Sequence, residues 1–164
     1  MILRLRPIWP VLTLFVSSAM LAAAHFYFQA YLALQPCQLC LKQREWHWGV
    51  LAVSALVFVV TRFKPAWLNW GIVLIGLVLL GSAGMGGYHV AVEQHLVVAQ
   101  CDVGATVNAA DLSLDNLAED LRPPRCDEIV WSLFGISMAG YNALISLALA
   151  LASFYVALTG RRSQ

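Results

Sequence analysis

The sequence predicts an all-α protein, a four-helix bundle whose helices cross a membrane. Apolar residues make up 60% of its 164 residues and charged residues 12%, whereas globular chains average about 45–50% and about 25%. So few charges cannot cover the surface of a water-soluble domain, and a net charge of +1 indicates no nucleic-acid partner. We therefore expect one integral membrane domain over residues 1–164, which excludes a soluble enzyme and a disordered chain.

Uncharged stretches mark the spans, because a membrane helix needs roughly 20 apolar residues. The sequence predicts four spans, near 9–28, 42–61, 67–88 and 136–158. In the second span the uncharged part, 46–61, is too short at about 1.5 Å per residue to cross a core of about 30 Å. Its helix must therefore include Lys42, Arg44 and Glu45 in its first turns, where charged residues favour a functional interpretation.

The basic residues predict the orientation. Six of the ten basic residues flank the spans on one side: Arg4, Arg6, Arg62, Lys64, Arg161 and Arg162. Short loops rich in Lys and Arg stay in the cytoplasm. We expect both termini to be cytoplasmic and two loops, near 29–41 and 89–135, to lie outside.

The first span has a second interpretation as a cleaved secretory signal, because Arg4 and Arg6 precede an apolar run that reaches Ala22-Ala23-Ala24. The segment continues without a break through His25-Phe26-Tyr27-Phe28-Gln29, which is typical of an aromatic belt at a helix end. We expect the span to be retained. Cleavage would leave the orientation of the other three spans unchanged.

Two further patterns predict local structure. Six glycines crowd the third span: Gly71, Gly76, Gly81, Gly84, Gly86 and Gly87. They indicate either close helix packing through small residues, with Ala83 and Gly87 in small-xxx-small spacing, or a flexible helix end that admits a ligand. In the second outer loop, Ser113 precedes a helical stripe of apolar residues that ends before Pro123-Pro124: Leu114, Leu117, Ala118 and Leu121. This stripe predicts a short amphipathic helix, lying either on the outer leaflet or on the end of the bundle.

All four cysteines, Cys37, Cys40, Cys101 and Cys126, fall in the two outer loops. An even number of cysteines facing an oxidising compartment indicates disulfides, and Cys101–Cys126 alone could be a passive staple. Cys37-Gln-Leu-Cys40 is different, because a bridge that closes so small a loop stabilises the fold little. The pair is better explained as a redox couple. Haem attachment needs a His where Leu41 stands, and a zinc knuckle needs a second close pair.

The neighbours of this CxxC pair favour thiolate chemistry. Pro36 precedes Cys37, so the sulfurs lie at the start of the second helix, whose partial positive charge stabilises a thiolate. Arg44 is four residues after Cys40, and His47 continues the same face. An Arg headgroup anchor and a polar interface His are the structural alternatives.

Several motifs follow one another in a specific order. They are Phe28-Gln29, Pro36-Cys37-Gln-Leu-Cys40, Gln43-Arg44, Tyr88-His89, Cys101-Asp102, Cys126 and Leu133-Phe134-Gly135-Ile136-Ser137-Met138. In order, spacing and topology this set resembles the bacterial disulfide bond formation protein B family, DsbB. The resemblance covers about residue 9 to 155, nearly the whole chain.

The resemblance implies a four-helix bundle in the bacterial inner membrane that uses a quinone, either ubiquinone or menaquinone. It implies that reduced DsbA, a periplasmic protein of thioredoxin fold, is the electron donor. Cys101 would form the mixed disulfide with DsbA, and Cys126 would be the partner of Cys101. Cys37 would exchange with this outer pair.

The resemblance also assigns residues to the quinone. Cys40 would face the quinone as a thiolate, with Arg44 beside the ring. His89 would lie near the quinone, and His47 is a further candidate because it continues the face of Arg44. DsbA has a reduction potential of about −120 mV, which makes it a strong oxidant among thiol proteins. Its re-oxidation therefore needs an even stronger electron acceptor, and a membrane quinone is one.

Other proteins would share parts of this pattern. A vitamin-K-epoxide-reductase-like protein is also a four-helix quinone reducer, but there the loop pair precedes the CxxC and here it follows. A DsbB-like paralogue with a dedicated partner would look nearly identical. The alternatives without catalysis are a thiolate metal-binding membrane protein and a structural membrane protein with stapled loops.

Overall fold

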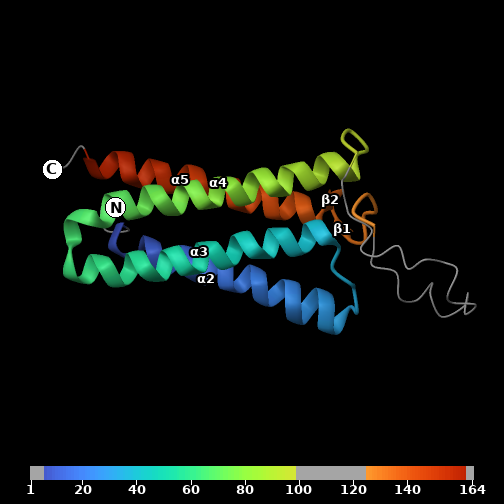
Figure 1. Cartoon of the computed structure of the whole chain (residues 1–164), viewed down its shortest axis with the longest axis horizontal. Helices are drawn as coiled ribbons and strands as arrows, with labels where there is room; N and C mark the ends of the chain where they lie inside the picture. Colours follow the sequence, from blue (N-terminus) through green and yellow to red (C-terminus); the bar gives the residue numbers. More distant parts are fainter. Residues whose placement is uncertain (1–5, 99–124, 162–164) are drawn as a thin grey trace, which may run out of the picture.

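The computed structural model describes residues 6–98 and 125–161. Its elements in chain order are the 3₁₀ turn η1 (Arg6–Ile8), α2 (Trp9–Ala22), the π-helix η2 (Ala23–Tyr31), α3 (Gln38–Phe63), the 3₁₀ turn η3 (Pro65–Trp67), α4 (Leu68–Glu93), β1 (Ser132–Leu133), β2 (Ile136–Ser137) and α5 (Met138–Arg161). The long helices run roughly side by side, and both ends of the chain lie at the same end of the bundle (Figure 1).

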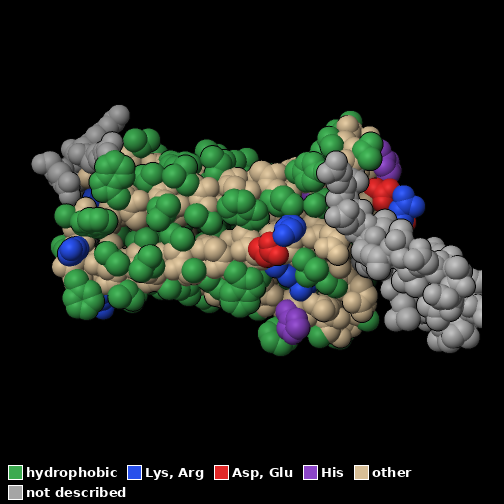
Figure 2. All heavy atoms as spheres, viewed as in Figure 1, with side chains coloured by type: hydrophobic (Ala, Val, Ile, Leu, Met, Phe, Trp, Pro, Cys, Tyr) green, Lys and Arg blue, Asp and Glu red, His purple; other side chains and the backbone are tan. Residues whose placement is uncertain are grey.

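Four helical segments in the described part of the chain are long and apolar enough to cross a membrane. They are Arg6–Tyr31, Gln38–Phe63, Pro65–Glu93 and Met138–Gly160. The predicted four-helix bundle is therefore confirmed, and the protein is a multi-pass membrane protein. Figure 2 shows hydrophobic side chains along the whole length of the helices, and Lys and Arg side chains at the end that carries the termini, in a patch further along the bundle and at the opposite end.

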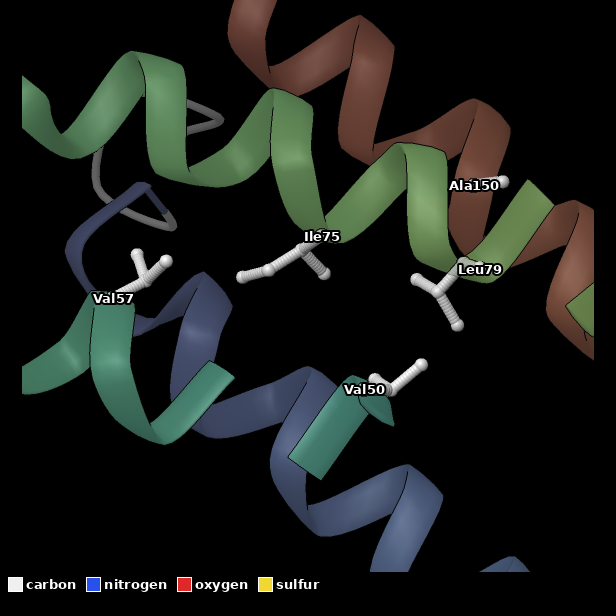
Figure 3. Packing of buried hydrophobic residues seen from close by; sticks show 5 residues of the cluster. All are labelled: Val50, Val57, Ile75, Leu79 and Ala150. Atoms are coloured by element: carbon white, nitrogen blue, oxygen red, sulfur yellow. The ribbon is translucent and has the colours of Figure 1, made fainter. Parts of the chain in front are cut away.

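The core is formed by α3, α4 and α5. Val50 and Val57 of α3 face Ile75 and Leu79 of α4, and Ala150 of α5 completes this buried cluster (Figure 3). Among the principal helices, α4 packs between α3 and α5, and α2 packs on α3. This order leaves the first and last spans with little mutual contact, which makes room between them near the cysteine end.

Buried hydroxyl groups join the helices pairwise. Thr13 and Ser54 link α2 to α3 through a 3.0 Å contact between their hydroxyl oxygens. Trp9 donates from Nε1 to Ser153 Oγ at 2.9 Å, which ties the start of α2 to α5. Such hydrogen bonds contribute to helix association where lipid supplies no hydrophobic driving force. The first span is thus packed as a member of the bundle.

The third span differs from its prediction at two points. α4 continues to Glu93 instead of ending near residue 88, so His89 and Glu93 lie on the helix and not in a loop. The close-packed glycine is Gly86, where an added Cβ would lie 2.9 Å from the backbone nitrogen of Ala143. Gly87 faces open space. The prediction that Gly87 packs against a neighbouring helix was therefore wrong, and the adjacent Gly86 makes that contact instead.

A small β-hairpin precedes α5 and was not predicted. Ser132 pairs with Ser137 and Leu133 with Ile136, around the two-residue turn Phe134-Gly135. Both turn residues have positive φ, 52° and 79°, as the favoured two-residue hairpin turn requires. Two-residue strands carry too little alternation to be recognised in a sequence. The predicted amphipathic helix after Ser113 lies outside the described residues, as does Cys101.

Candidate redox site

Cys37 is the residue that caps α3. Its extended backbone ends the preceding loop, and its sulfur accepts the backbone N–H of Cys40 at 3.2 Å. The predicted position of the CxxC at a helix N-terminus is therefore correct. Cys37 and Cys40 are free thiols here, and their two sulfur atoms share a hydrogen bond across 2.7 Å.

These contacts make the two sulfurs unequal. The hydrogen bond with the Cys40 thiol contributes most to lowering the pKa of Cys37, burial opposes it, and His89 and the Cys40 backbone N–H lower it further. The pKa of Cys37 falls from an ordinary 9.0 to about 4. In this dithiol state the geometry favours a thiolate at Cys37. The thiolate role that the resemblance gives Cys40 concerns a different state, in which Cys37 is bonded to another sulfur, and stays a prediction.

His89 lies beside the buried sulfur. Its Nε2 is 3.7 Å from Cys37 Sγ and 3.9 Å from the carboxylate Oε1 of Glu93. On the other side of the ring, Nδ1 is 2.6 Å from the amide nitrogen of Gln43. The imidazole is therefore held between an amide, a thiol and a carboxylate, and it touches a reacting atom.

His47 does not touch the CxxC pair. It is 4% exposed, and its Nε2 lies 2.7 Å from Asn142 Oδ1. Asn142 in turn donates from Nδ2 to Gln43 Oε1 at 2.6 Å. The two histidines thus lie at the ends of one buried polar chain, in which Gln43 and Asn142 are the links.

Arg44 connects the second span to the first. Its guanidinium donates to Gln29 Oε1 at 2.9 Å and to the backbone oxygen of Ala24 at 3.1 Å. Both partners lie in the π-helical end of the first span. The side chain therefore fixes the distance between two helices while its charge faces the cavity described next.

A cavity of about 300 Å³ lies at the cysteine end of the bundle. Its polar lining contains the candidate residues Cys37, Cys40, Arg44, His47 and His89, together with Gln43 and Glu93. Aromatic rings line it too: Phe28 stands edge-on to Trp131 with ring centres 4.9 Å apart, and Tyr141 follows at 6.1 Å. Apolar walls with a few convergent polar groups are typical of a small-molecule site.

Cys126 lies next to the first pair. It is 2% exposed and packs in one buried cluster with Cys37 and Val92, against which Cys40 also lies. Cys126 is disulfide-bonded. The structure therefore places Cys126 in one buried cluster with the first cysteine of the CxxC, whereas Cys101 lies outside the described residues.

Sequence reasoning missed several residues of the site, namely Gln43 and Asn142 as bridges, Glu93 as the partner of His89, and Trp131 and Tyr141 as cavity walls. Glu93 had a usable signal, because it ends the uncharged stretch of the third span and follows His89 by one helical turn. Asn142 had none, because its partners lie 95 and 99 residues away in the sequence.

The same atoms could also hold a metal ion. The sulfurs of Cys37 and Cys40 and a ring nitrogen of His89 lie within 4.8 Å of one another. Two thiolates and an imidazole are ligands that suit a soft or borderline cation such as Zn²⁺.

Fold and site together define a class of protein. A multi-pass helical bundle with a CxxC at a helix N-terminus, and a disulfide-bonded cysteine beside it, has the parts of a membrane thiol–disulfide oxidoreductase. The chain matches the family described as disulfide bond formation protein DsbB over residues 6–156, and it belongs to that family.

Individual relatives agree with the family match. The chain is 31% identical to disulfide bond formation protein B of Nitrosococcus oceani, over 93% of this chain and 92% of the relative. It is 29% identical to disulfide bond formation protein B 2 of Pseudomonas syringae pv. syringae, over 85% and 82%. No solved structure was found that matches the chain significantly.

Proposed function

We propose that this protein re-oxidises a periplasmic thioredoxin-fold dithiol protein of the DsbA type and passes the electrons to a membrane quinone. The observation that carries the proposal is the apolar cavity into which Cys40, Arg44 and His89 all face as lining residues. The reaction oxidises the dithiol of the donor to a disulfide, and disulfide bond formation is what the family is named for.

The lining of the cavity fits a quinone. A quinone needs flat apolar walls for its ring and donors for its two carbonyl oxygens; Trp131 and Phe28 supply such walls, and Arg44 and His89 supply donors. The cavity is also bounded by Met20 and Leu21 of the first span, which leaves an apolar flank for a lipid-like tail. A bound quinone would accept two electrons and two protons.

The cysteines form a relay in this proposal. A donor thiolate attacks Cys101 in the outer disulfide, and Cys126 leaves as a thiolate. That thiolate attacks Cys37 in a Cys37–Cys40 disulfide, and Cys40 leaves as a thiolate that faces the cavity. Each exchange breaks one S–S bond and forms another. The burial of Cys126 against Cys37 supports the second exchange.

The orientation follows the charge pattern. Arg62 and Lys64 lie at the turn between α3 and α4, at the end of the bundle that carries the termini, and the start of α3 with its CxxC lies at the other end (Figure 1). With the basic end in the cytoplasm, the cysteines face the periplasm of an inner-membrane protein, where an oxidising compartment sustains the disulfides.

A trapping experiment tests the relay. Thiol exchange passes through a mixed disulfide, and removal of the resolving sulfur stalls it there. In Cys126→Ser, Cys101 has lost its disulfide partner, so its thiolate should attack the disulfide of an oxidised thioredoxin-fold partner and release one partner sulfur as a thiolate. The covalent adduct should accumulate and be visible on a non-reducing gel. The matched variant Cys101→Ser should not form the adduct. Cys40→Ser should react once at the outer pair and then fail to reduce quinone.

Two results would contradict this order. If the adduct forms equally well through Cys37, the Cys101–Cys126 disulfide has a structural role and does not take part in the relay. A purified protein that carries no quinone, and whose four thiols do not cycle when reduced partner and quinone are supplied, would contradict the activity itself.

The group of two thiols and an imidazole favours a second candidate, a thiolate metal-binding membrane protein. This candidate requires metal retained through purification and cysteines that stay reduced in air. Metal analysis on the protein as isolated, beside a count of free thiols, separates the two functions.

A further inference from the structure

The turn between α3 and α4, at the end of the bundle opposite the cysteines, brings basic and aromatic side chains together. α3 ends at Phe63, and Lys64 leaves the helical conformation because Pro65 follows it. The 3₁₀ turn η3 then leads directly into α4. The side chains of Arg62, Phe63, Lys64 and Trp67 are all exposed along this short stretch.

A shallow cavity opens beside this turn. Its volume is about 260 Å³, and it is lined by Val60, Phe63, Lys64 and Trp67. Phe63 is 82% exposed and Trp67 is 60% exposed, so two large rings flank a lysine where the bundle ends. Aromatic residues at the end of a membrane helix lie at the boundary between hydrocarbon and headgroups. The cavity therefore combines apolar walls with a cation at headgroup depth.

The polar groups of this cavity have no partner in the described part of the chain. Nζ of Lys64 lies 6.0 Å from the centre of the Trp67 ring, and a ring face orients a cation without neutralising its charge. Neither this ammonium group nor the indole N–H of Trp67 forms an ion pair or a side-chain hydrogen bond with another described residue. The cavity thus offers two hydrogen-bond donors, one of them charged, to an acceptor from another molecule.

Carboxylates of the neighbouring helices lie far from this turn. The acidic residue that precedes it is Glu45, 17 residues before Arg62, which is about 26 Å along a helix axis. The acidic residue that follows it is Glu93, at the far end of α4, and α5 has none. On the face drawn in Figure 2, the end that carries the termini shows Lys and Arg side chains and no Asp or Glu. Charge complementarity therefore calls for an anion from another molecule.

We propose that the cavity beside the α3–α4 turn binds the headgroup of an anionic phospholipid. The ammonium group of Lys64 and the indole N–H of Trp67 donate to the phosphate, and Val60 and Phe63 contact the glycerol and the first carbons of the acyl chains. Under the orientation proposed above, the turn lies at the cytoplasmic leaflet, where basic pockets between membrane helices bind such headgroups. The site lies at the other end of the bundle from the cysteines and takes part in no step of the relay.

Charge favours an anionic lipid over other occupants of this cavity. The ammonium group of Lys64 attracts a phosphate and repels the choline cation of phosphatidylcholine. It also lies over the Trp67 ring, which is the surface that a quaternary ammonium would occupy. A second copy of this chain that packed through the same cavity would bring two Lys64 side chains together, because the interface of a symmetric dimer pairs the same patch on both subunits.

Native mass spectrometry of the purified full-length protein in a neutral detergent tests the proposal. Phosphatidylglycerol and phosphatidylcholine with identical acyl chains are titrated separately, and the dissociation constants of the first bound lipid are compared. Phosphatidylglycerol should bind about fivefold or more tightly, which is the contribution of one basic residue near a membrane surface. Lys64→Gln should remove most of this preference, and Lys64→Arg should keep it.

Arg62→Gln is the matched control, because it removes an equal charge from the same turn but outside the cavity lining. Arg62 and Val60 are two residues apart on α3 and do not share a face of the helix, and the Arg62 guanidinium lies 5.3 Å from the centre of the Phe58 ring. Arg62→Gln should retain the preference for phosphatidylglycerol. Equal losses in Arg62→Gln and Lys64→Gln would mean that the lipid responds to the overall surface charge, and this result would overturn the proposal. A preference that survives Lys64→Gln would overturn it too.

Further measurements identify the occupant of the cavity. Glycerol 3-phosphate, a soluble phosphate ester, should not displace phosphatidylglycerol, because it lacks the acyl chains; displacement at equal concentration would overturn binding of a lipid in favour of a free phosphate. A dimer in the same spectra that Phe63→Ala dissociates would assign the cavity to a second copy of this chain instead. Phosphatidylglycerol should also raise the Tm of the wild type, as a ligand of the native state does, and not that of Lys64→Gln. No thiol or quinone takes part, so these results are independent of the proposed redox function.

Discussion

At the scale of single residues, the two thiols of the CxxC pair do different things because they occupy different backbone positions. Cys37 precedes the helix, so its sulfur can accept the N–H of Cys40, which has no partner inside the first turn. Cys40 lies one turn further, and its sulfur shares a hydrogen bond with that of Cys37, which lowers the pKa of Cys37. The result is a thiolate–thiol pair with a pKa of about 4 at Cys37.

This asymmetry predicts how the reduction potential of the pair depends on pH. Above about pH 4 the reduced pair holds one proton instead of two, so reduction by two electrons takes up one proton. The midpoint potential should then fall as pH rises, by about 30 mV per pH unit instead of about 59 mV. Redox titration of a Cys101→Ser/Cys126→Ser protein between pH 5 and 8 measures the slope. A slope near the two-proton value would place both sulfurs in the thiol form.

Arg44 carries the second prediction at this scale. Arg44→Ala should raise the KM for quinone by about tenfold or more, because a hydrogen bond from a charged donor contributes about 1.5–3 kcal/mol. Arg44→Lys should recover part of the loss, since it keeps the charge without the planar fork. Steady-state kinetics against quinone concentration give both values.

A control separates the charge of Arg44 from its role in holding the helices. Gln29→Ala removes the acceptor of one guanidinium hydrogen bond and leaves the charge in place, so its KM should rise less than that of Arg44→Ala. Equal effects would mean that Arg44 acts by fixing the first span and not by meeting the cofactor.

A sequence predicts those parts of the site whose residues are close together along the chain. The CxxC, its place at a helix start and Arg44 on the same face all follow from spacing within one helix turn or two. The chain from His89 through Gln43 and Asn142 to His47 joins three helices, and no pattern within any one of them marks it. Glu93 is recognisable as a partner only once α4 is known to reach it.

At the scale of elements, the sequence predicts the number of membrane spans and the central part of each span better than the residues at which the spans end. Charge-free stretches predict where hydrocarbon must be crossed, and polar residues at helix ends are compatible with both helix and loop. α3 begins at Gln38, as Pro36 and the short uncharged stretch predicted, whereas α4 continues to Glu93 beyond its predicted end near residue 88. The last turn of α4 packs around the cavity, a tertiary contact that sequence periodicity does not report.

The packing of α4 on α5 gives a prediction with a matched control in the next residue. At Gly86 an added Cβ would meet the backbone of Ala143 at 2.9 Å, and backbone cannot move aside as a flexible side chain can. Gly86→Ala should therefore lower the free energy of unfolding by about 1–3 kcal/mol. Gly87→Ala meets no atom within 4 Å and should be neutral or gain up to about 1 kcal/mol from helix propensity.

Unfolding of both variants by an ionic detergent in mixed micelles, followed by circular dichroism, compares their free energies. Equal destabilisation by the two substitutions would mean that the helices are not in contact along the Gly86 face. The Ala83–Gly87 spacing seen in the sequence would then describe the helix interface, with Gly87 in contact with α5.

At the scale of the whole molecule, function depends on a separation between two ends. The bundle places both termini and the Arg62–Lys64 turn at one end, and the start of α3 with its CxxC and the β1–β2 hairpin at the other (Figure 1). The cavity lies at this second end. A soluble donor can meet the sulfurs only from the side to which this end projects. The orientation in the membrane therefore decides which compartment supplies the electrons.

The last prediction concerns that orientation. In a background with all four cysteines replaced by Ser, single cysteines are introduced at Lys64 and at Val98, which is 91% exposed at the cysteine end. Basic residues of short loops are retained in the cytoplasm, so an impermeant maleimide should label Val98→Cys in intact spheroplasts and Lys64→Cys only after permeabilisation. The reverse pattern would place the cysteine end in the cytoplasm, where thiols are kept reduced, and a periplasmic donor could not reach it. Labelling of Lys64→Cys in permeabilised cells controls for the reactivity of that position.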